Sequence, residues 1–84
     1  MTDDALLTVK APMSGVFYRF PAPDQPAFVE TGTRVRKGQT LALLESMKLF
    51  TKIKAPADGI VAEVCVTNEQ IVSVGEALFR LERQ

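Results

Sequence analysis

The chain repeats a pattern of its own residues, and this repeat constrains the fold more than any other feature. Residues 11–15 (Ala-Pro-Met-Ser-Gly) recur as residues 55–59 (Ala-Pro-Ala-Asp-Gly), displaced by 44 positions. Further along, the displacement is 37, and six residues match their counterparts: Val29, Val35, Gly38, Leu41, Leu44 and Glu45 correspond to Val66, Val72, Gly75, Leu78, Leu81 and Glu82. Two matching halves within 84 residues predict two copies of one supersecondary unit that share a single core.

Each half has the residue pattern of short β-strands. Runs of β-branched and aromatic residues alternate with turns that are rich in proline and glycine. Those turns fall at residues 12–15, 37–38, 56–59 and 74–75. No window of the chain carries the apolar stripe of an amphipathic helix. The sequence therefore predicts an all-β domain of about eight short strands, arranged in two small sheets that fold over each other.

The first half carries an insertion that the second half lacks. The two displacements differ by 44 − 37 = 7 residues, which fall between Phe20 and Val29. We call residues 21–28 the insertion loop. Its three prolines fix φ and cannot donate hydrogen bonds to a sheet. We therefore expect an ordered loop that protrudes from the sheets, although such a loop on its own is also typical of a tolerated surface insertion.

A lysine lies at the junction of the two halves. Residues 40–45 and 49–55 have the pattern of two strands, and Lys48 lies in the short turn between them. Such a turn would hold the amine in solvent. A lysine amine in water is almost entirely protonated at neutral pH, and the neighbours Met47 and Leu49 bring no cation or pocket that would change this. Lys48 is therefore better suited as the substrate of an enzyme that brings an activated acyl group than as a nucleophile of its own.

The composition limits the chemistry of the domain. It has no histidine, and Cys65 is its single cysteine, which excludes a Cys/His metal cluster and a His-activated nucleophile. Ten acidic and ten basic residues cancel, so net charge predicts neither a nucleic-acid nor a membrane partner. No apolar run is long enough to span a membrane, and the first residues are polar and acidic. We therefore expect a cytoplasmic protein, and a lone cysteine agrees with a reducing compartment.

The dipeptide Met47-Lys48 on such a turn resembles the attachment site of biotinyl domains, the carrier modules of biotin-dependent carboxylases. The resemblance covers nearly the whole chain. It implies the flattened β-barrel, or barrel-sandwich, that biotinyl and lipoyl domains share, with the two halves related by a pseudo-two-fold axis. It also implies covalent biotin on Lys48 and no catalytic or metal-binding residue in the domain. The chain departs from the family at Ser46, where alanine is usual, and at Leu49, where methionine is usual.

The insertion loop extends this resemblance. It looks like the thumb of the carriers from bacterial and plastid acetyl-CoA carboxylases, an element that most other biotinyl domains lack. The resemblance implies that the tip of the loop contacts the biotin ring, and in this chain the tip consists of Pro23, Asp24, Gln25 and Pro26.

Residues beside the lysine are expected to be recognised by other proteins. Strand alternation groups Phe50 with Lys52 and Lys54 on the solvent face, which leaves an exposed aromatic ring near the turn. A single exposed apolar residue is common on protein surfaces, and Met47 has the alternative of packing sideways on the hairpin. The resemblance implies contacts with a ligase or partner enzyme at five positions: Glu45, Ser46, Met47, Leu49 and Phe50.

The function implied by the resemblance is that of a biotin carboxyl carrier, a non-catalytic part of a carboxylase. Biotin protein ligase would attach the cofactor, biotin carboxylase would load a carboxyl group, and a carboxyltransferase would pass it to an acyl-CoA. Acetyl-CoA, in fatty acid biosynthesis, is the expected acceptor. The alternatives are a lipoyl carrier, in which Asp typically stands where this chain has Met47, and an unmodified domain used for protein contacts. The domain is expected at residues 6–83 after a short tail at 1–5, as either an excised domain or a stand-alone carrier.

Overall fold

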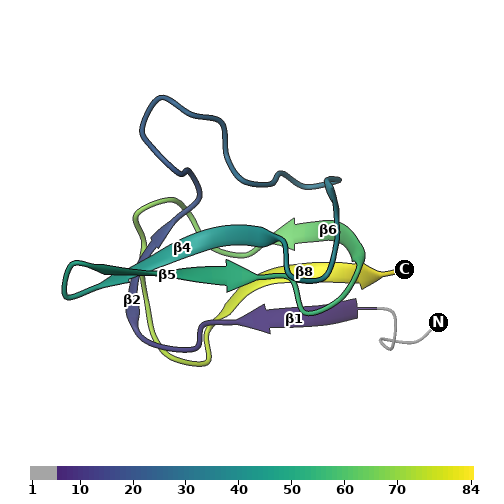
Figure 1. The fold of residues 1–84 in the computed structure, drawn as a ribbon. Helices are drawn as coiled ribbons and strands as arrows, with labels where there is room; N and C mark the ends of the chain where they lie inside the picture. The colour runs from purple at the N-terminus through teal and green to yellow at the C-terminus, as the bar shows by residue number, and fades with distance from the viewer. Residues whose placement is uncertain (1–5) are drawn as a thin grey trace.

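Eight antiparallel strands form the fold of the chain in a computed structural model, which describes residues 6–84 (Figure 1). The strands are β1 (Leu6–Lys10), β2 (Gly15–Tyr18), β3 (Arg34–Val35), β4 (Thr40–Ser46), β5 (Leu49–Lys54), β6 (Gly59–Val64), β7 (Ile71–Val72) and β8 (Ala77–Arg83). They make two four-stranded sheets, with the orders β1-β8-β6-β3 and β5-β4-β2-β7. The all-β prediction is confirmed, and the predicted tail at 1–5 lies outside the described residues. No helix in the described part of the chain could span a membrane.

The two sheets are copies of each other. Exchanging β1 with β5, β2 with β6, β3 with β7 and β4 with β8 turns one strand order into the other. Loop hydrogen bonds repeat as well: the Gly32 N–H donates to the Val61 carbonyl at 2.7 Å, and the Glu69 N–H donates to the Phe17 carbonyl at 2.6 Å. The predicted pseudo-two-fold relation between the halves is therefore confirmed at the level of both strands and loops.

The core lies between the sheets and uses the matched positions of the repeat. Residues at these positions are at most 1% exposed in both halves: Val35 and Val72, Leu41 and Leu78, and Leu44 and Leu81. Phe17 and Phe79 lie at the centre, with ring centroids 5.8 Å apart. Equivalent side chains from the two halves thus fill the space between the sheets, which is why the same apolar spacing recurs along the chain.

Two glycines allow strands to approach closely at equivalent places. A Cβ atom added to Gly15 would lie 2.6 Å from the carbonyl oxygen of Glu45, and one added to Gly59 would lie 2.6 Å from that of Glu82. Real Cβ atoms do not approach a backbone oxygen this closely. Glycine at the start of β2 and of β6 is therefore a packing requirement of the fold.

The insertion loop projects from the body between β2 and β3, as Figure 1 shows above the sheets. Its tip contains a turn in which the Gln25 N–H donates to the Ala22 carbonyl at 3.1 Å. Its ends are joined where the Phe28 N–H donates to the Arg19 carbonyl at 2.9 Å. The expected protruding loop is present, and a backbone hydrogen bond closes its base.

Candidate functional site

The β4–β5 hairpin places Lys48 at its tip. Ser46 pairs with Leu49, so only Met47 and Lys48 form the turn. Both have positive φ, 55° and 67°, as in the type I′ turns that match the twist of two-residue hairpins. Both side chains are exposed, Met47 at 90%. The amine of Lys48 is thus held in solvent on a short, well-defined turn, at the left end of the molecule in Figure 1.

This turn carries residues that its backbone does not favour. Type I′ turns usually contain Asn-Gly, because asparagine and glycine adopt positive φ easily. A residue with a larger side chain in this region costs on the order of 1 kcal/mol. Met47 and Lys48 therefore reduce the stability of the hairpin, which indicates that the two side chains are present for a reason other than folding.

Replacing Met47 with asparagine should stabilise the domain. Asparagine suits the positive φ of 55° at this position, so the Met47→Asn variant should gain about 0.5–1 kcal/mol in the free energy of unfolding. The midpoint of thermal unfolding should rise by about 4 °C. Met47→Ala is the matched control, because it removes the same exposed side chain without a preference for positive φ. Equal midpoints for the asparagine and alanine variants would contradict the strained-turn interpretation.

A polar and aromatic cluster supports the base of this hairpin. The Tyr18 hydroxyl donates a hydrogen bond to Glu45 Oε1 at 3.0 Å, which joins β2 to β4. The Tyr18 ring packs against Phe50 of β5 at 6.0 Å between centroids and a tilt of 50°. The hydrogen bond to Glu45 and, after it, burial raise the pKa of Tyr18. The three side chains thus hold one another on the outer face of the sheet, next to the turn.

The side chains around Lys48 form an exposed apolar tip. Phe50 is 59% exposed, as its position on the solvent face predicts, and Lys52 and Lys54 share that face. Leu49 lies on the opposite face of β5 from Phe50, yet it is 71% exposed. The buried residues of that face begin only at Ile53, because the tip of the hairpin extends beyond the body of the domain (Figure 1). Alternation alone does not predict the exposure of Leu49.

The predicted site residues fall into two groups in the structure. Glu45 and Ser46 are half-buried at the end of β4, and with Met47, Leu49 and Phe50 they surround Lys48. The second group is the exposed tip of the insertion loop: Pro23, Asp24, Gln25 and Pro26. In the described residues, no hydrogen bond joins the tip of the loop to the hairpin.

Two residues of this region were not identified from the sequence. Tyr18 supports Glu45 and Phe50 from a neighbouring strand, and Arg19, just before the insertion loop, contacts residues at the far end of the loop. The alternation around the buried Phe17 is a signal that could have placed Tyr18 on the outer face. No local pattern indicates which residues of other strands these side chains reach.

Other chemistry receives little support from the structure. No group of three or more His, Cys, Asp or Glu residues within 6–84 is arranged to hold a metal ion. Cys65 is half-buried, and burial, followed by the charge of Glu63, raises the pKa of its thiol. A thiol with a raised pKa forms little of the reactive thiolate at neutral pH. Lys48 and its surroundings remain the best candidate site.

Known proteins resemble the chain over almost its whole length. The model of the family described as "Biotin-requiring enzyme" matches residues 7–81. A biotin carboxyl carrier protein of acetyl-CoA carboxylase from Nostoc sp. is 44% identical over 80 residues, which cover 95% of this chain and 44% of that protein. The protein of that name from Streptococcus pyogenes serotype M6 is 42% identical over 74 residues, covering 88% and 45% respectively. The chain thus spans less than half the length of these curated relatives.

Solved structures share the fold. A chain described as a single-chain, multi-domain long-chain acyl-CoA carboxylase superposes with a TM-score of 0.83 at 23% identity, covering 100% of this chain and 8% of that one. The urea carboxylase of Kluyveromyces lactis gives a TM-score of 0.77 at 20% identity, covering 96% and 6%. The same barrel-sandwich therefore occurs as one small part of much longer chains.

Proposed function

The chain belongs to the biotin-requiring family, and on that premise we propose that it is a biotin carboxyl carrier whose cofactor is attached to Lys48. The observation that carries this proposal is the position of Lys48, exposed on a two-residue turn at the junction of two matching halves. The names of the curated relatives support acetyl-CoA carboxylase as the complex in which it acts.

Attachment requires that the Lys48 amine reach an activated carboxyl group of biotin. A ligase would supply the biotinyl-adenylate; the amine nitrogen attacks the carbonyl carbon, AMP leaves, and the amine loses a proton as the amide forms. The side chain of Lys48 can enter the active site of a ligase because it is fully outside the sheets. Bound biotin supplies the ureido nitrogen that carries the carboxyl group, while the domain itself only positions it.

The apolar tip around Lys48 is the surface that partner enzymes would recognise. Met47, Leu49 and Phe50 are exposed at 90%, 71% and 59%, so each could be buried on contact with another protein. Glu45 and Ser46 complete the surface on β4, and Tyr18 holds the Glu45 carboxylate in one orientation. We assign this surface to contacts with biotin protein ligase, with biotin carboxylase and with a carboxyltransferase.

The insertion loop would contact the biotin ring. Its tip, the stretch from Pro23 to Pro26, is exposed and is constrained by prolines, so it can present a fixed surface without folding anew for each contact. No side-chain hydrogen bond in residues 6–84 involves Asp24 or Gln25, which leaves their polar side-chain atoms free for the cofactor. We therefore propose that the loop and the lysine act together once biotin links them.

Deleting most of the loop should show whether it is needed for folding or only for contact with the cofactor. Deletion of residues 21–26 leaves Arg19-Phe20-Ala27-Phe28, in which the existing bond between the Arg19 carbonyl and the Phe28 N–H becomes the i to i+3 bond of a β-turn. The shortened domain should fold and unfold with a midpoint within about 5 °C of the parent, since loop shortening changes closure entropy little. Loss of the folded NMR spectrum would show that the loop has a structural role.

In the intact domain, the amide signals of Asp24 and Gln25 should move when biotin is attached. The comparison is between the NMR spectra of the unmodified and the biotinylated protein. Residues at the other end of the β4–β5 hairpin from Lys48, such as Gly38, whose N–H donates to the Ala55 carbonyl, serve as the internal control. If only residues beside Lys48 shift, the loop does not contact the cofactor.

An intact-mass measurement tests the function directly. Protein from cells with an active biotin ligase should carry one biotinyl increment. A lipoyl increment would identify a lipoyl carrier instead, and an unmodified mass would favour a domain used only for protein contacts. Peptide mapping of the modified protein should place the increment on Lys48.

A further inference from the structure

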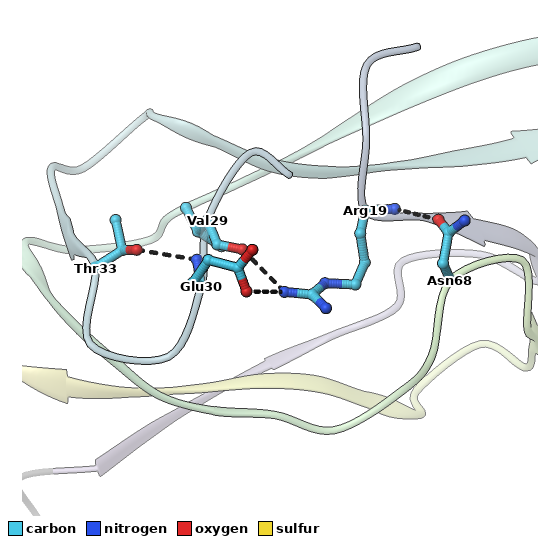
Figure 2. Close-up of polar contacts among 5 residues, drawn as sticks. All are labelled: Arg19, Val29, Glu30, Thr33 and Asn68. Atoms are coloured by element: carbon cyan, nitrogen blue, oxygen red, sulfur yellow. Dashed lines mark hydrogen bonds and ion pairs between the residues drawn. The ribbon is translucent and has the colours of Figure 1, made fainter. Parts of the chain in front are cut away.

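Arg19 lies just before the insertion loop and forms hydrogen bonds with residues at the far end of the loop, as Figure 2 shows in part. Its backbone carbonyl accepts a hydrogen bond from the Phe28 N–H at 2.9 Å. Its Nη2 donates to the Val29 carbonyl at 3.1 Å and to Glu30 Oε1 at 2.8 Å. Its backbone N–H donates to Asn68 Oδ1 at 2.8 Å, which anchors the residue to the second half of the domain. We call this set the Arg19 clamp.

The carboxylate end of the clamp is itself fixed. The Glu30 N–H donates to Thr33 Oγ1 at 2.9 Å, and the Thr33 N–H donates to the Glu30 carbonyl at 3.0 Å. Val29 is 3% exposed and belongs to the core. Arg19, just before the loop, is therefore connected to Val29 and Glu30 just after the loop, and these two residues are held by the core and by Thr33.

The second half of the domain serves as an internal control for this arrangement. In the strand register, Tyr18 opposite Leu43 matches Glu63 opposite Arg80, so the counterpart of Arg19 is Val64, which only Cys65 separates from the core residue Val66. Val64 is half-buried at the end of β6 and packs against the core. The second half thus builds an equivalent sheet without an insertion and without a guanidinium group in this place, so the fold itself does not need Arg19.

Stability alone gives little reason to keep this residue. The Arg19 side chain is 24% exposed and that of Glu30 is 68% exposed, and ion pairs with one solvated partner contribute little. The Arg19 Nε atom is buried and has no hydrogen-bond partner, which carries a desolvation cost. The favourable and unfavourable contributions of the guanidinium group therefore oppose each other.

We propose that Arg19 is a positioning residue, which fixes the direction of the insertion loop so that its tip can meet the cofactor on Lys48. The part of the inference that concerns the cofactor rests on the proposed function. The part that concerns the loop does not, because the clamp exists in the unmodified chain. Without the guanidinium contacts, the loop would keep the Arg19–Phe28 backbone bond and the packing of Phe28 against the core, while its tip would sample several directions.

The test replaces Arg19 with methionine, which keeps an apolar side chain of similar reach and removes the guanidinium donors. In unmodified full-chain protein, backbone order parameters of Asp24 and Gln25 should fall from about 0.85, typical of a rigid backbone, to below about 0.6. The unfolding midpoint should stay within about 5 °C of the parent. Unchanged order parameters would overturn the positioning role.

Two further variants keep the result interpretable. Arg80→Met removes the ion pair with Glu63, which is no part of the Arg19 clamp, and should leave the loop order unchanged. Glu30→Ala removes one exposed partner of the clamp, so it provides a milder version of the same effect if Arg19→Met fails to fold. If Arg19→Met does not fold, unchanged order parameters of the loop in Glu30→Ala would count against the clamp instead.

The biotinylated Arg19→Met protein tests the link to the cofactor. The shifts of Asp24 and Gln25 that attachment causes in the parent should be largely lost, while those of residues beside Lys48 persist. Shifts of the parent size in a disordered loop would overturn the link to biotin. A protein that carries no biotin at all would contradict the proposed function, whereas the order parameters of the unmodified chain would still decide whether Arg19 positions the loop.

Discussion

Lys48→Arg should yield a folded domain that carries no biotin. Arginine keeps the positive charge and a similar reach at the turn, but its guanidinium does not form the amide that a lysine amine forms with the activated acid. Since Lys48 is exposed and solvated, the free energy of unfolding should change by no more than about 0.5 kcal/mol. The measurement is the intact mass, together with streptavidin binding, of protein made with an active ligase; the biotinyl increment should be absent.

Lys52→Arg is the matched control for this experiment. Lys52 is exposed on β5, four positions further along the chain, but it pairs with Leu43 within the ladder rather than lying on the turn. This variant should be fully biotinylated. Streptavidin-detectable label on Lys48→Arg would mean that another amine is the acceptor, and the carrier assignment would lose the observation on which it is built.

Alanine at Gly15 or at Gly59 should destabilise the domain more than alanine at any exposed glycine. The added methyl group would lie 2.6 Å from a carbonyl oxygen of the neighbouring strand, and that oxygen belongs to backbone that cannot rotate away. Overpacking of this kind typically costs about 1–3 kcal/mol, and we expect the upper end, because two paired strands must move apart. Urea unfolding of the two single variants should give similar losses, since the sites are equivalent in the repeat.

Gly32→Ala provides the comparison. Nothing lies within 4 Å of a Cβ at Gly32, but its φ of +94° is unfavourable for alanine. The expected cost there is about 1 kcal/mol. If Gly15→Ala and Gly59→Ala cost no more than Gly32→Ala, the close approach of the strands is not a constraint on the fold.

The repeat is the reason that so much of the fold could be predicted from the sequence. A position that is apolar in both halves faces the same core twice, so pairs such as Leu41 and Leu78 identify buried sites without knowledge of the topology. The turn glycines Gly38 and Gly75 likewise share one conformation, with φ of 88° and 87°. The strand pattern and the position of Lys48 on a turn follow from such local information.

The parts that could not be predicted depend on contacts between distant residues. Tyr18 and Glu45 are 27 positions apart, and Arg19 and Asn68 are 49 apart, so no local pattern pairs them. The positive φ of Met47 and Lys48 is also hidden, because the turn lacks the asparagine and glycine that usually indicate it. The unpredicted features lie either in the Lys48 hairpin or at the base of the insertion loop. In the hairpin, the observed positive φ also differs from the local preference of methionine and lysine.

The pseudo-two-fold relation also fixes where the ends of the domain lie. The pair formed by Glu45 and Phe50, beside the lysine, corresponds in the other half to the pair formed by Glu82 and Leu6. The start of β1 and the end of β8 therefore lie at the opposite pole from the turn, as Figure 1 shows, in a molecule with a long dimension of 41 Å. A tag, a surface linker or a neighbouring domain could be fused to the start of β1 or to the end of β8. Lys48 would then lie a full domain length away from that attachment, and the attached partner would not obstruct it.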